Sequence, residues 1–276
     1  MQIDDKPDRI GLRYPVDVPL VGDDRSGDLS VVQVARQVAS DRRAAALVLF
    51  INSRGGSSTA SEAMRAALRS VAARKPVVVV MGATAASGGY WVATPGSWIV
   101  ARPGTLTGSI GVLSGKLVTG GLWQRLLFNR ETIAFGEHVT LTGDERPFSE
   151  EERRIVRGDI ERIYRVFIEI VAAARKLAPD DVETNAQGKV WTGRQALERK
   201  LVDELGGLDA GVARARALAG LPKDALLREV HGPRRMIPAV AAPAAAAWFG
   251  YLLDGLSILA KAPALAVMDY LPGELT

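Results

Sequence analysis

The chain of 276 residues contains no cysteine, only two histidines and few lysines. Without cysteine the protein cannot form a disulfide, use a thiolate nucleophile or bind zinc through sulfur. The two histidines, His138 and His231, are too few for a multi-histidine metal site. Neither a phosphate-binding glycine loop nor a dinucleotide fingerprint is present. We therefore expect no metal and no cofactor.

The sequence also lacks a large excess of charge of one sign, because it has 35 basic and 31 acidic residues and a net charge of +4. No basic run is longer than a pair such as Arg153–Arg154, so nucleic acid is not an expected partner. Residues 1–30 contain no signal peptide and no anchor. We expect a bacterial protein that is cytoplasmic, or membrane-associated through a part outside this chain.

Apolar runs of strand length alternate with stretches of helical periodicity. The expected strands are 45–52, 76–82, 97–102, 108–113 and 131–135. The expected helices are 29–41, 58–74, 87–96, 119–128 and 149–177. The pairs Thr59–Glu62 and Ser149–Glu152 have the spacing of capping boxes. The alternation predicts an α/β fold, with a parallel sheet covered by helices on both faces.

The C-terminal stretch is apolar and contains several prolines. Within it, Met236–Leu253 has no charged residue and at 18 residues just reaches the length of a membrane span. Its two prolines and many alanines favour a helix docked on this protein or on a sister subunit. Peripheral membrane contact through 236–260 and a true span are the alternatives.

Two glycine-containing loops follow consecutive strands and suit acyl transfer, which needs a nucleophile, a base and donors for the oxyanion. Ser87, in ASGGYW, follows a buried strand and opens a helix. The amide of Gly88, with those of Gly55 and Gly56 in INSRGGSS, can approach a ligand without side chains in the way. We predict Ser87 as nucleophile and these glycines as the oxyanion hole. The alternative is that the small residues serve only tight strand–helix packing.

Several motifs in order carry a family resemblance: FINSRGGSSTASEAM, KPVVVVMGATAASGGYWVATP, PGTLTGSIGV and AQGKVWTGRQALERKLVDELGG. They resemble the signal peptide peptidase A family of serine peptidases. The resemblance implies a ClpP/crotonase-like domain over 8–225, between an N-terminal segment 1–7 and an apolar extension 226–276. It implies that Ser87 belongs to a Ser–Lys dyad and that Gly108, Ser109 and Ile110 lie along the substrate cleft.

The expected substrates are apolar peptides such as cleaved signal peptides, again as the resemblance implies. Tyr90 and Trp91, directly after the Ser-Gly-Gly motif, are predicted to form an apolar wall of the substrate pocket. A crotonase-type acyl-CoA enzyme is a rival function. It would need an acidic catalytic group beside the oxyanion glycines, and the serine at 87 argues against it.

The base is where this chain departs from the family. In the single-length form, the lysine position corresponds to about Val139, and no lysine lies between Lys116 and Lys176. The chain resembles the C-terminal, serine-bearing half of the double-length form. We therefore expect the lysine from another domain or subunit, in a homo-oligomer or a complex with a lysine-bearing sister. Lys116 or His138 as local base, or a catalytically inactive peptide-binding or scaffold subunit, are the alternatives.

Overall fold

The computed structural model describes residues 9–11, 15–16, 28–127, 131–133, 135–228, 230 and 265–267. The chain divides into two compact units. Of the described residues, those within 9–111, 164–230 and 266–267 belong to the first unit, and those within 112–163, with 265, belong to the second. We predicted a single peptidase domain over 8–225, with no boundary at Val112 or Ile163.

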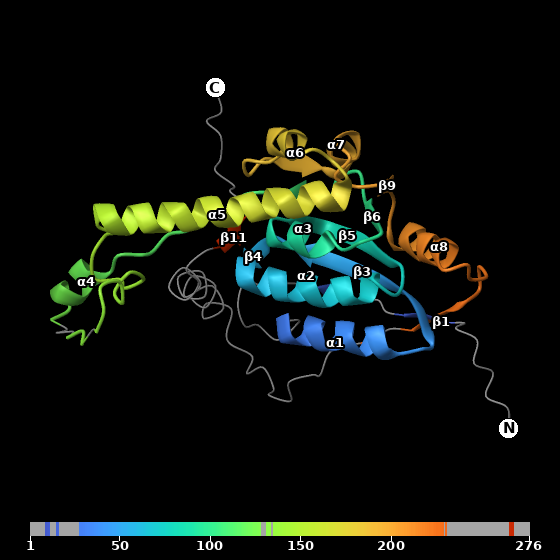
Figure 1. Cartoon of the computed structure of the whole chain (residues 1–276), viewed down its shortest axis with the longest axis horizontal. Helices are drawn as coiled ribbons and strands as arrows, with labels where there is room; N and C mark the ends of the chain where they lie inside the picture. Colours follow the sequence, from blue (N-terminus) through green and yellow to red (C-terminus); the bar gives the residue numbers. More distant parts are fainter. Residues whose placement is uncertain are drawn as a thin grey trace. The chain divides into compact units, whose positions relative to one another are not determined.

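A mostly parallel sheet forms the centre of the first unit (Figure 1). Its main path runs β10-β1-β3-β5-β6-β9, and β2, β7 and β8 lie off this path. The bounds are β1 (Arg9–Gly11), β2 (Pro15–Val16), β3 (Ala44–Ser53), β5 (Val77–Ala86), β6 (Trp98–Ala101), β7 (Leu106–Gly108), β8 (Val190–Thr192), β9 (Glu204–Leu205) and β10 (Leu226–Arg228). Among the described strand pairs of this sheet, that of β7 with β8 is antiparallel and the others are parallel. Separately, β4 (Gly55–Ser57) pairs with β11 (Leu265–Val267).

Both faces of the central strands are buried, which explains their continuous apolar sequences. On one face, Val78 and Val80 of β5 pack with Val212 of α8 (Leu208–Leu218). The residues that point to the other face, such as Leu49 and Val79, are equally buried. Strands covered on both sides need no polar alternation. The predicted α/β fold with a mostly parallel sheet is confirmed.

The remaining helices are α1 (Asp28–Ser40), α2 (Ser58–Ala72), α3 (Gly88–Ala93), α4 (Gly120–Arg125), α5 (Glu150–Arg175), α6 (Pro179–Asn185) and α7 (Gly193–Glu198). Figure 1 shows α1 and α2 side by side, in agreement with their extensive contacts. The part of α5 from Tyr164 to Arg175 belongs to the first unit and buries Phe167 and Val171. The ring of Phe167 lies 4.5 Å from that of Trp91 on α3, measured between centroids.

Three local predictions were wrong. The strand expected at 108–113 is β7, which ends at Gly108, and residues 131–133 and 135 contain no strand. Helix α2 is capped not by Thr59 but by Ser57, whose side chain accepts the N–H of Ala60. Glu62 is not in a capping box either, because it binds Arg65 and the indole N–H of Trp91.

The second capping box is confirmed at the start of α5. The Ser149 side chain accepts the amide N–H of Glu152 at 3.2 Å, and the Glu152 carboxylate accepts the amide N–H of Ser149 at 2.7 Å. The guanidinium of Arg146 adds two hydrogen bonds to that carboxylate, at 2.7 and 2.8 Å. These bonds, first those from Arg146, lower the pKa of Glu152 to about 2.

Acid is therefore expected to loosen the first turn of α5. Since the pKa of Glu152 is lowered in the folded state, its stabilising contribution is complete above the ordinary value of 4.5 and is lost as the pH falls through about 2. Hydrogen-exchange protection factors of the Ser149 and Glu152 amides, measured from pH 5 to pH 2, should fall over this interval. Glu152→Gln should remove the pH dependence, and an equal dependence in both proteins would contradict this origin.

The apolar stretch Met236–Leu253 lies outside the described residues, so its predicted docking is not addressed by the structure. Among the helices that are described, none combines the length and the apolar character that crossing a bilayer requires.

Candidate active site

Ser87 occupies the turn between β5 and α3 in a strained conformation. Its φ of 53° and ψ of −120° lie where residues with a side chain are rarely found. The turn is fixed on both sides, because the Ser87 N–H donates to the carbonyl of Gly108 at 2.8 Å and its carbonyl accepts the N–H of Trp91 at 2.9 Å. In α/β-hydrolases, a strained strand–helix turn of this kind presents the serine nucleophile.

The hydroxyl of Ser87 is buried and lacks a partner. The residue has 0% exposure, and Oγ makes no hydrogen bond to any residue that the structure describes. A buried polar atom without a partner is costly, and such atoms are concentrated at functional sites. Among the described residues, this hydroxyl therefore has no hydrogen bond that an external group would have to displace.

The predicted glycines meet directly beside Ser87. A Cβ added to Gly88 would lie 3.0 Å from the amide nitrogen of Gly56 and 3.4 Å from Cα of Gly55. The backbones of the two loops thus approach so closely that a side chain would not fit. The N–H of Gly55 already donates to Oγ of Ser53 at 3.1 Å. Of this pair, we therefore propose the amide of Gly56, rather than that of Gly55, as an oxyanion donor.

A second buried hydroxyl accompanies the first. In the parallel pairing of β5 with β7, Ala86 is opposite Gly108, so Ser87 and Ser109 are the next residues of two neighbouring chain segments. Ser109 also has a positive φ, 49°, and its Oγ is likewise buried without a hydrogen-bond partner within the described part of the chain. The sequence placed Ser109 in the cleft but did not reveal this pairing, which follows only from the strand register.

The residues predicted to line the cleft are more buried than expected. Tyr90 is 0% exposed and donates its hydroxyl to the carbonyl of Leu201, while Trp91 is 2% exposed. Both side chains therefore lie in the core of this chain, as Ser87 does at 0% exposure, and their role as a pocket wall stays a prediction. Ile110 is also 0% exposed.

The backbone that follows β7 is already paired along one edge. The N–H of Ser109 donates to the carbonyl of Lys189 at 2.8 Å, and the carbonyl of Ile110 accepts the N–H of Gly188 at 3.0 Å. A peptide could not bond to those two groups without displacing the turn that contains Gly188. Substrate pairing with 108–110, as the sequence predicted, would have to use the remaining backbone groups.

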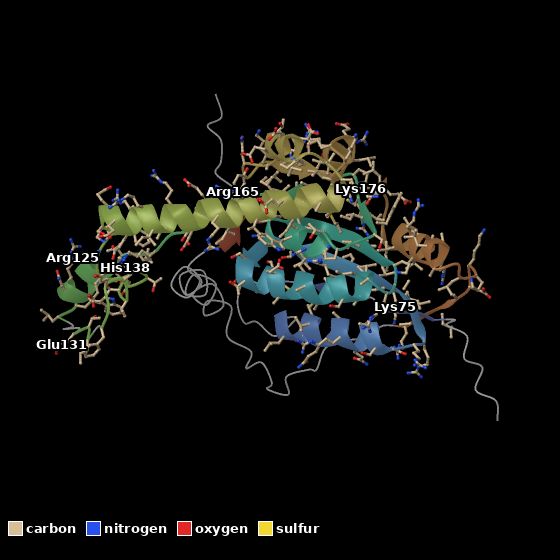
Figure 2. The ribbon with its side chains drawn as sticks, in the orientation of Figure 1. Lys75, Arg125, Glu131, His138, Arg165 and Lys176 are labelled. Carbon is tan, nitrogen blue, oxygen red and sulfur yellow. The ribbon has the colours of Figure 1, made fainter. Side chains whose placement is uncertain are left out.

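No amine takes the position where the family resemblance expects one. Val139 is 59% exposed and lies in the second unit, as do His138, Arg125 and Glu131 (Figure 2). Lys116, also in the second unit, donates to the carbonyl of Leu141 at 3.1 Å, and its ammonium lies 4.3 Å from the ring centroid of Phe148. Burial lowers the pKa of Lys116, but its ammonium is held by these local contacts.

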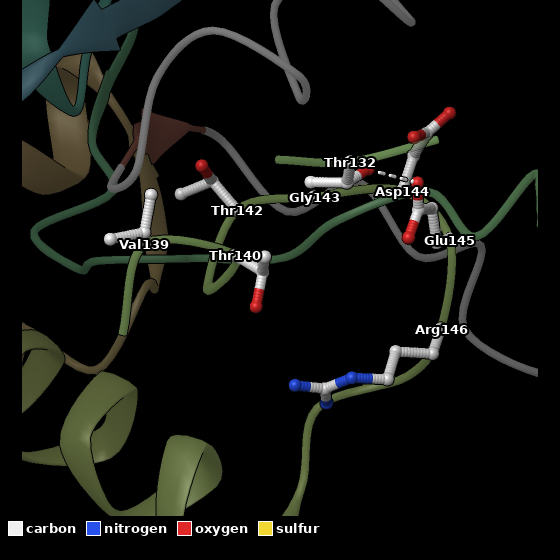
Figure 3. Close-up of a pocket in the computed structure, with 8 residues that line it drawn as sticks. All are labelled: Thr132, Val139, Thr140, Thr142, Gly143, Asp144, Glu145 and Arg146. Atoms are coloured by element: carbon white, nitrogen blue, oxygen red, sulfur yellow. Dashed lines mark hydrogen bonds between the residues drawn. The ribbon is translucent and has the colours of Figure 1, made fainter. Parts of the chain in front are cut away.

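Val139 borders an open hollow of about 320 Å³ in the second unit (Figure 3). Its lining consists of Thr132, Val139, Thr140, Thr142, Gly143, Asp144, Glu145 and Arg146. The cation of this lining is Arg146, whose guanidinium is bound to Glu152. Arginine stays protonated in proteins, so it cannot serve as a base here. Clusters of three or more metal-ligating side chains do not occur among the residues described.

Comparisons with known proteins agree with the motifs. The chain is 36% identical to the chloroplastic serine protease SPPA of Arabidopsis thaliana over 211 residues, and 41% identical to Protease 4 of Salmonella typhi over 196 residues. These alignments cover 75% and 71% of this chain but 31% of each relative. This chain thus spans about a third of the length of these two relatives.

A relative of similar length is slr0021 of Synechocystis sp., 32% identical over 80% of both chains. Among solved structures, a ClpP1 variant from Listeria monocytogenes matches with a TM-score of 0.48 and 14% identity, covering 74% of this chain and 94% of that one. The family model of Peptidase family S49 matches residues 69–222. This match covers more than half of the chain and includes Ser87. The chain therefore belongs to Peptidase family S49, as its motifs predicted.

Proposed function

We propose that this protein is a serine endopeptidase that cleaves apolar peptides, such as cleaved signal peptides, through an acyl-enzyme on Ser87. The observation that carries the proposal is the strained, buried Ser87 hydroxyl beside the closely packed backbones of Gly56 and Gly88. Family membership supports the reaction class. The names of the relatives, two of which are proteases, support it further.

The reaction follows from this arrangement. Oγ of Ser87 attacks the peptide carbonyl carbon while its proton passes to a neutral amine. The amides of Gly88 and Gly56 donate to the oxyanion, which returns its electrons as the C–N bond breaks. The protonated amine gives its proton to the departing nitrogen. Water, deprotonated by the same amine, then hydrolyses the ester and releases the second peptide.

The amine is proposed to come from a lysine of another domain or subunit. A neutral lysine could accept the hydroxyl proton of Ser87 and donate to Oγ of Ser109, which would satisfy both unpartnered hydroxyls. A water-excluded site would lower the pKa of that lysine and so keep it neutral. The length of the Arabidopsis and Salmonella relatives leaves room for a lysine-bearing half beyond the part matched here.

The surface of the second unit supports an assembly. Three apolar side chains there are almost fully exposed: Leu127 at 93%, Phe135 at 88% and Ile133 at 83%. Side chains of this size seldom remain in water on a monomeric protein when they gather within one segment. We propose that a second copy or a lysine-bearing sister domain covers them.

The source of the base can be tested by labelling Ser87 with a fluorophosphonate. The chain alone is expected to react slowly, and adding a lysine-bearing half from a double-length member of the family should accelerate labelling by about 10²–10⁴-fold, the usual contribution of a general base. Lys116→Met and His138→Gln should leave both rates unchanged.

Two results would contradict the trans-acting lysine. Loss of labelling in Lys116→Met that is not restored by mixing with Ser87→Ala chains, which retain Lys116, would place the base within the same chain. Failure of any lysine-bearing half, or of concentrating the chain itself, to accelerate labelling would favour a catalytically inactive peptide-binding or scaffold subunit.

A further inference from the structure

Strand β5, which ends at Ala86 directly before Ser87, has two more residues than its neighbour β3 between two registered pairs. From Leu47 opposite Val77 to Ile51 opposite Met81, β3 and β5 advance residue for residue. The next registered pair is Ser53 opposite Ala85. Between these two pairs β3 advances by two residues and β5 by four, so β5 bulges at Gly82–Thr84. Ala83 within the bulge is exposed although the strand around it is buried.

The bulge decides where the two catalytic loops meet. Without it, Ser53 would be opposite Ala83, and Ser87 would extend about 7 Å, two strand residues, beyond the loop that follows Ser53. With it, Gly89 packs against the carbonyl of Ser53, and Gly88 packs against the amide of Gly56. Bulges beside active sites commonly redirect a side chain in this way.

Asn52 is the side chain that fills the irregularity. Its Oδ1 accepts the N–H of Thr84 at 3.1 Å, so the amide donor of a bulged residue gains a partner. Asn52 packs so closely on Gly82 that a side chain would not fit there. A Cβ at this position would lie 2.8 Å from Oδ1 and 2.9 Å from Cβ of Asn52. Asn52 and Gly82 therefore pack directly against one another beside the bulge.

A threonine hydroxyl just before β7 also bonds to the bulged segment. Oγ1 of Thr105 donates to the carbonyl of Gly82 at 2.7 Å and accepts the N–H of Arg102 at 3.1 Å. Thr107, the next threonine along, donates to the carbonyl of Ala85 at 2.7 Å. Thr105 is 2% exposed and Thr107 0%, so these bonds form in a dry environment where a lost partner is costly.

We propose that Asn52 is a positioning residue for the oxyanion hole: by fixing the bulge at Gly82–Thr84, it sets the register between the Gly88 amide and the Gly56 amide. This inference rests on the proposed function, because an oxyanion hole is needed only if Ser87 is acylated. It assigns Asn52 no contact with substrate. Its effect should fall on the tetrahedral intermediate rather than on the binding of the peptide.

The test replaces Asn52 by leucine, which has a similar volume but no acceptor for the Thr84 amide. The fluorophosphonate rate constant of Ser87, measured with the lysine-bearing half present, should fall about 10²-fold, as expected for a displacement of about 1 Å at a reacting centre. For peptide hydrolysis, kcat should fall equally while KM stays within about threefold. A peptide boronate, which forms a tetrahedral adduct, should lose affinity, whereas the same peptide as a free carboxylate should not.

The matched control is Ser97→Ala. Oγ of Ser97 accepts the N–H of Val77 at 3.3 Å, at the other end of the same strand β5. This variant removes a comparable hydrogen bond but leaves the bulge intact, so its labelling rate should stay within about threefold of wild type. Thermal unfolding of each variant shows that the chains compared are folded. Thr105→Val removes the hydrogen bond to the carbonyl of Gly82 in the bulge. It serves as the test variant if Asn52→Leu does not fold.

The outcomes separate the two hypotheses. If the wild-type chain with its lysine-bearing half does not react with the fluorophosphonate, the proposed function fails and the positioning role fails with it. If wild type reacts and both bulge variants react at the same rate, only the role of Asn52 is overturned. Equal losses of boronate and carboxylate affinity would also overturn it, because a general disturbance of the cleft would then explain the result.

Discussion

Ser87→Gly is expected to abolish acylation and peptide hydrolysis while making the folded chain more stable. A residue with a Cβ at φ 53° and ψ −120° carries about 1–3 kcal/mol of backbone strain, which glycine does not. Glycine loses about 0.5–1 kcal/mol through the greater freedom of the unfolded chain. Removing a buried hydroxyl that has no partner adds to the gain. The free energy of unfolding should therefore rise by about 1 kcal/mol, measured by urea denaturation.

Ser87→Ala is the control that separates strain from chemistry. Alanine keeps the Cβ, and therefore the strain, but removes the hydroxyl. Both variants should lose peptide hydrolysis by about 10⁴–10⁶-fold, as is usual when a serine nucleophile is removed. Only the glycine variant should gain the stability that comes from relaxing the backbone. Wild-type labelling in either variant would exclude Ser87 as nucleophile, and a glycine variant less stable than the alanine variant would disprove the strain.

The parts of the site that the sequence predicted are those that depend on a single strand and its end. β3 and β5 are continuous apolar runs, and parallel strands bring their carboxyl ends to one edge of a sheet. That rule places the loops that contain Gly55–Gly56 and Gly88 at one edge of the sheet, whereas their close approach also depends on the register shift in β5. The prediction needed no side-chain contact, which is why it could be made from the sequence.

The parts that the sequence missed depend on register between strands. The sequence predicted that this strand ends at Gly82, because glycine weakens a strand, and it did not predict that β5 continues through a bulge to Ala86. The partnership of Ser109 with Ser87 requires knowing that Ala86 lies opposite Gly108. Similarly, the burial of Tyr90 depends on the carbonyl of Leu201, 111 residues away in the chain. Periodicity in the sequence indicates which face of a helix or strand is apolar, but it does not identify the residues that pack against that face.

Gly88→Ala is expected to reduce the acylation rate of Ser87 by about 10²–10³-fold, the range seen when one oxyanion donor is lost. The new Cβ would lie 3.0 Å from the amide nitrogen of Gly56 and 2.6 Å from Oγ of Ser61. Since both neighbours are packed, the two loops must separate, and the amides cannot then converge on one oxygen atom. Such overpacking should also cost about 1–3 kcal/mol of stability, measured by urea denaturation.

Relieving only one of the two contacts distinguishes crowding from the loss of the oxyanion hole. In the double variant with Ser61→Ala, the 2.6 Å contact with Oγ disappears but the contact with the Gly56 amide remains. Stability should recover in part, while labelling by the fluorophosphonate should stay low. Gly104→Ala, where an added Cβ has no neighbour within 4 Å, should change neither quantity. Recovery of labelling in the double variant would show that the collision with Ser61, and not displacement of the Gly56 amide, had caused the loss.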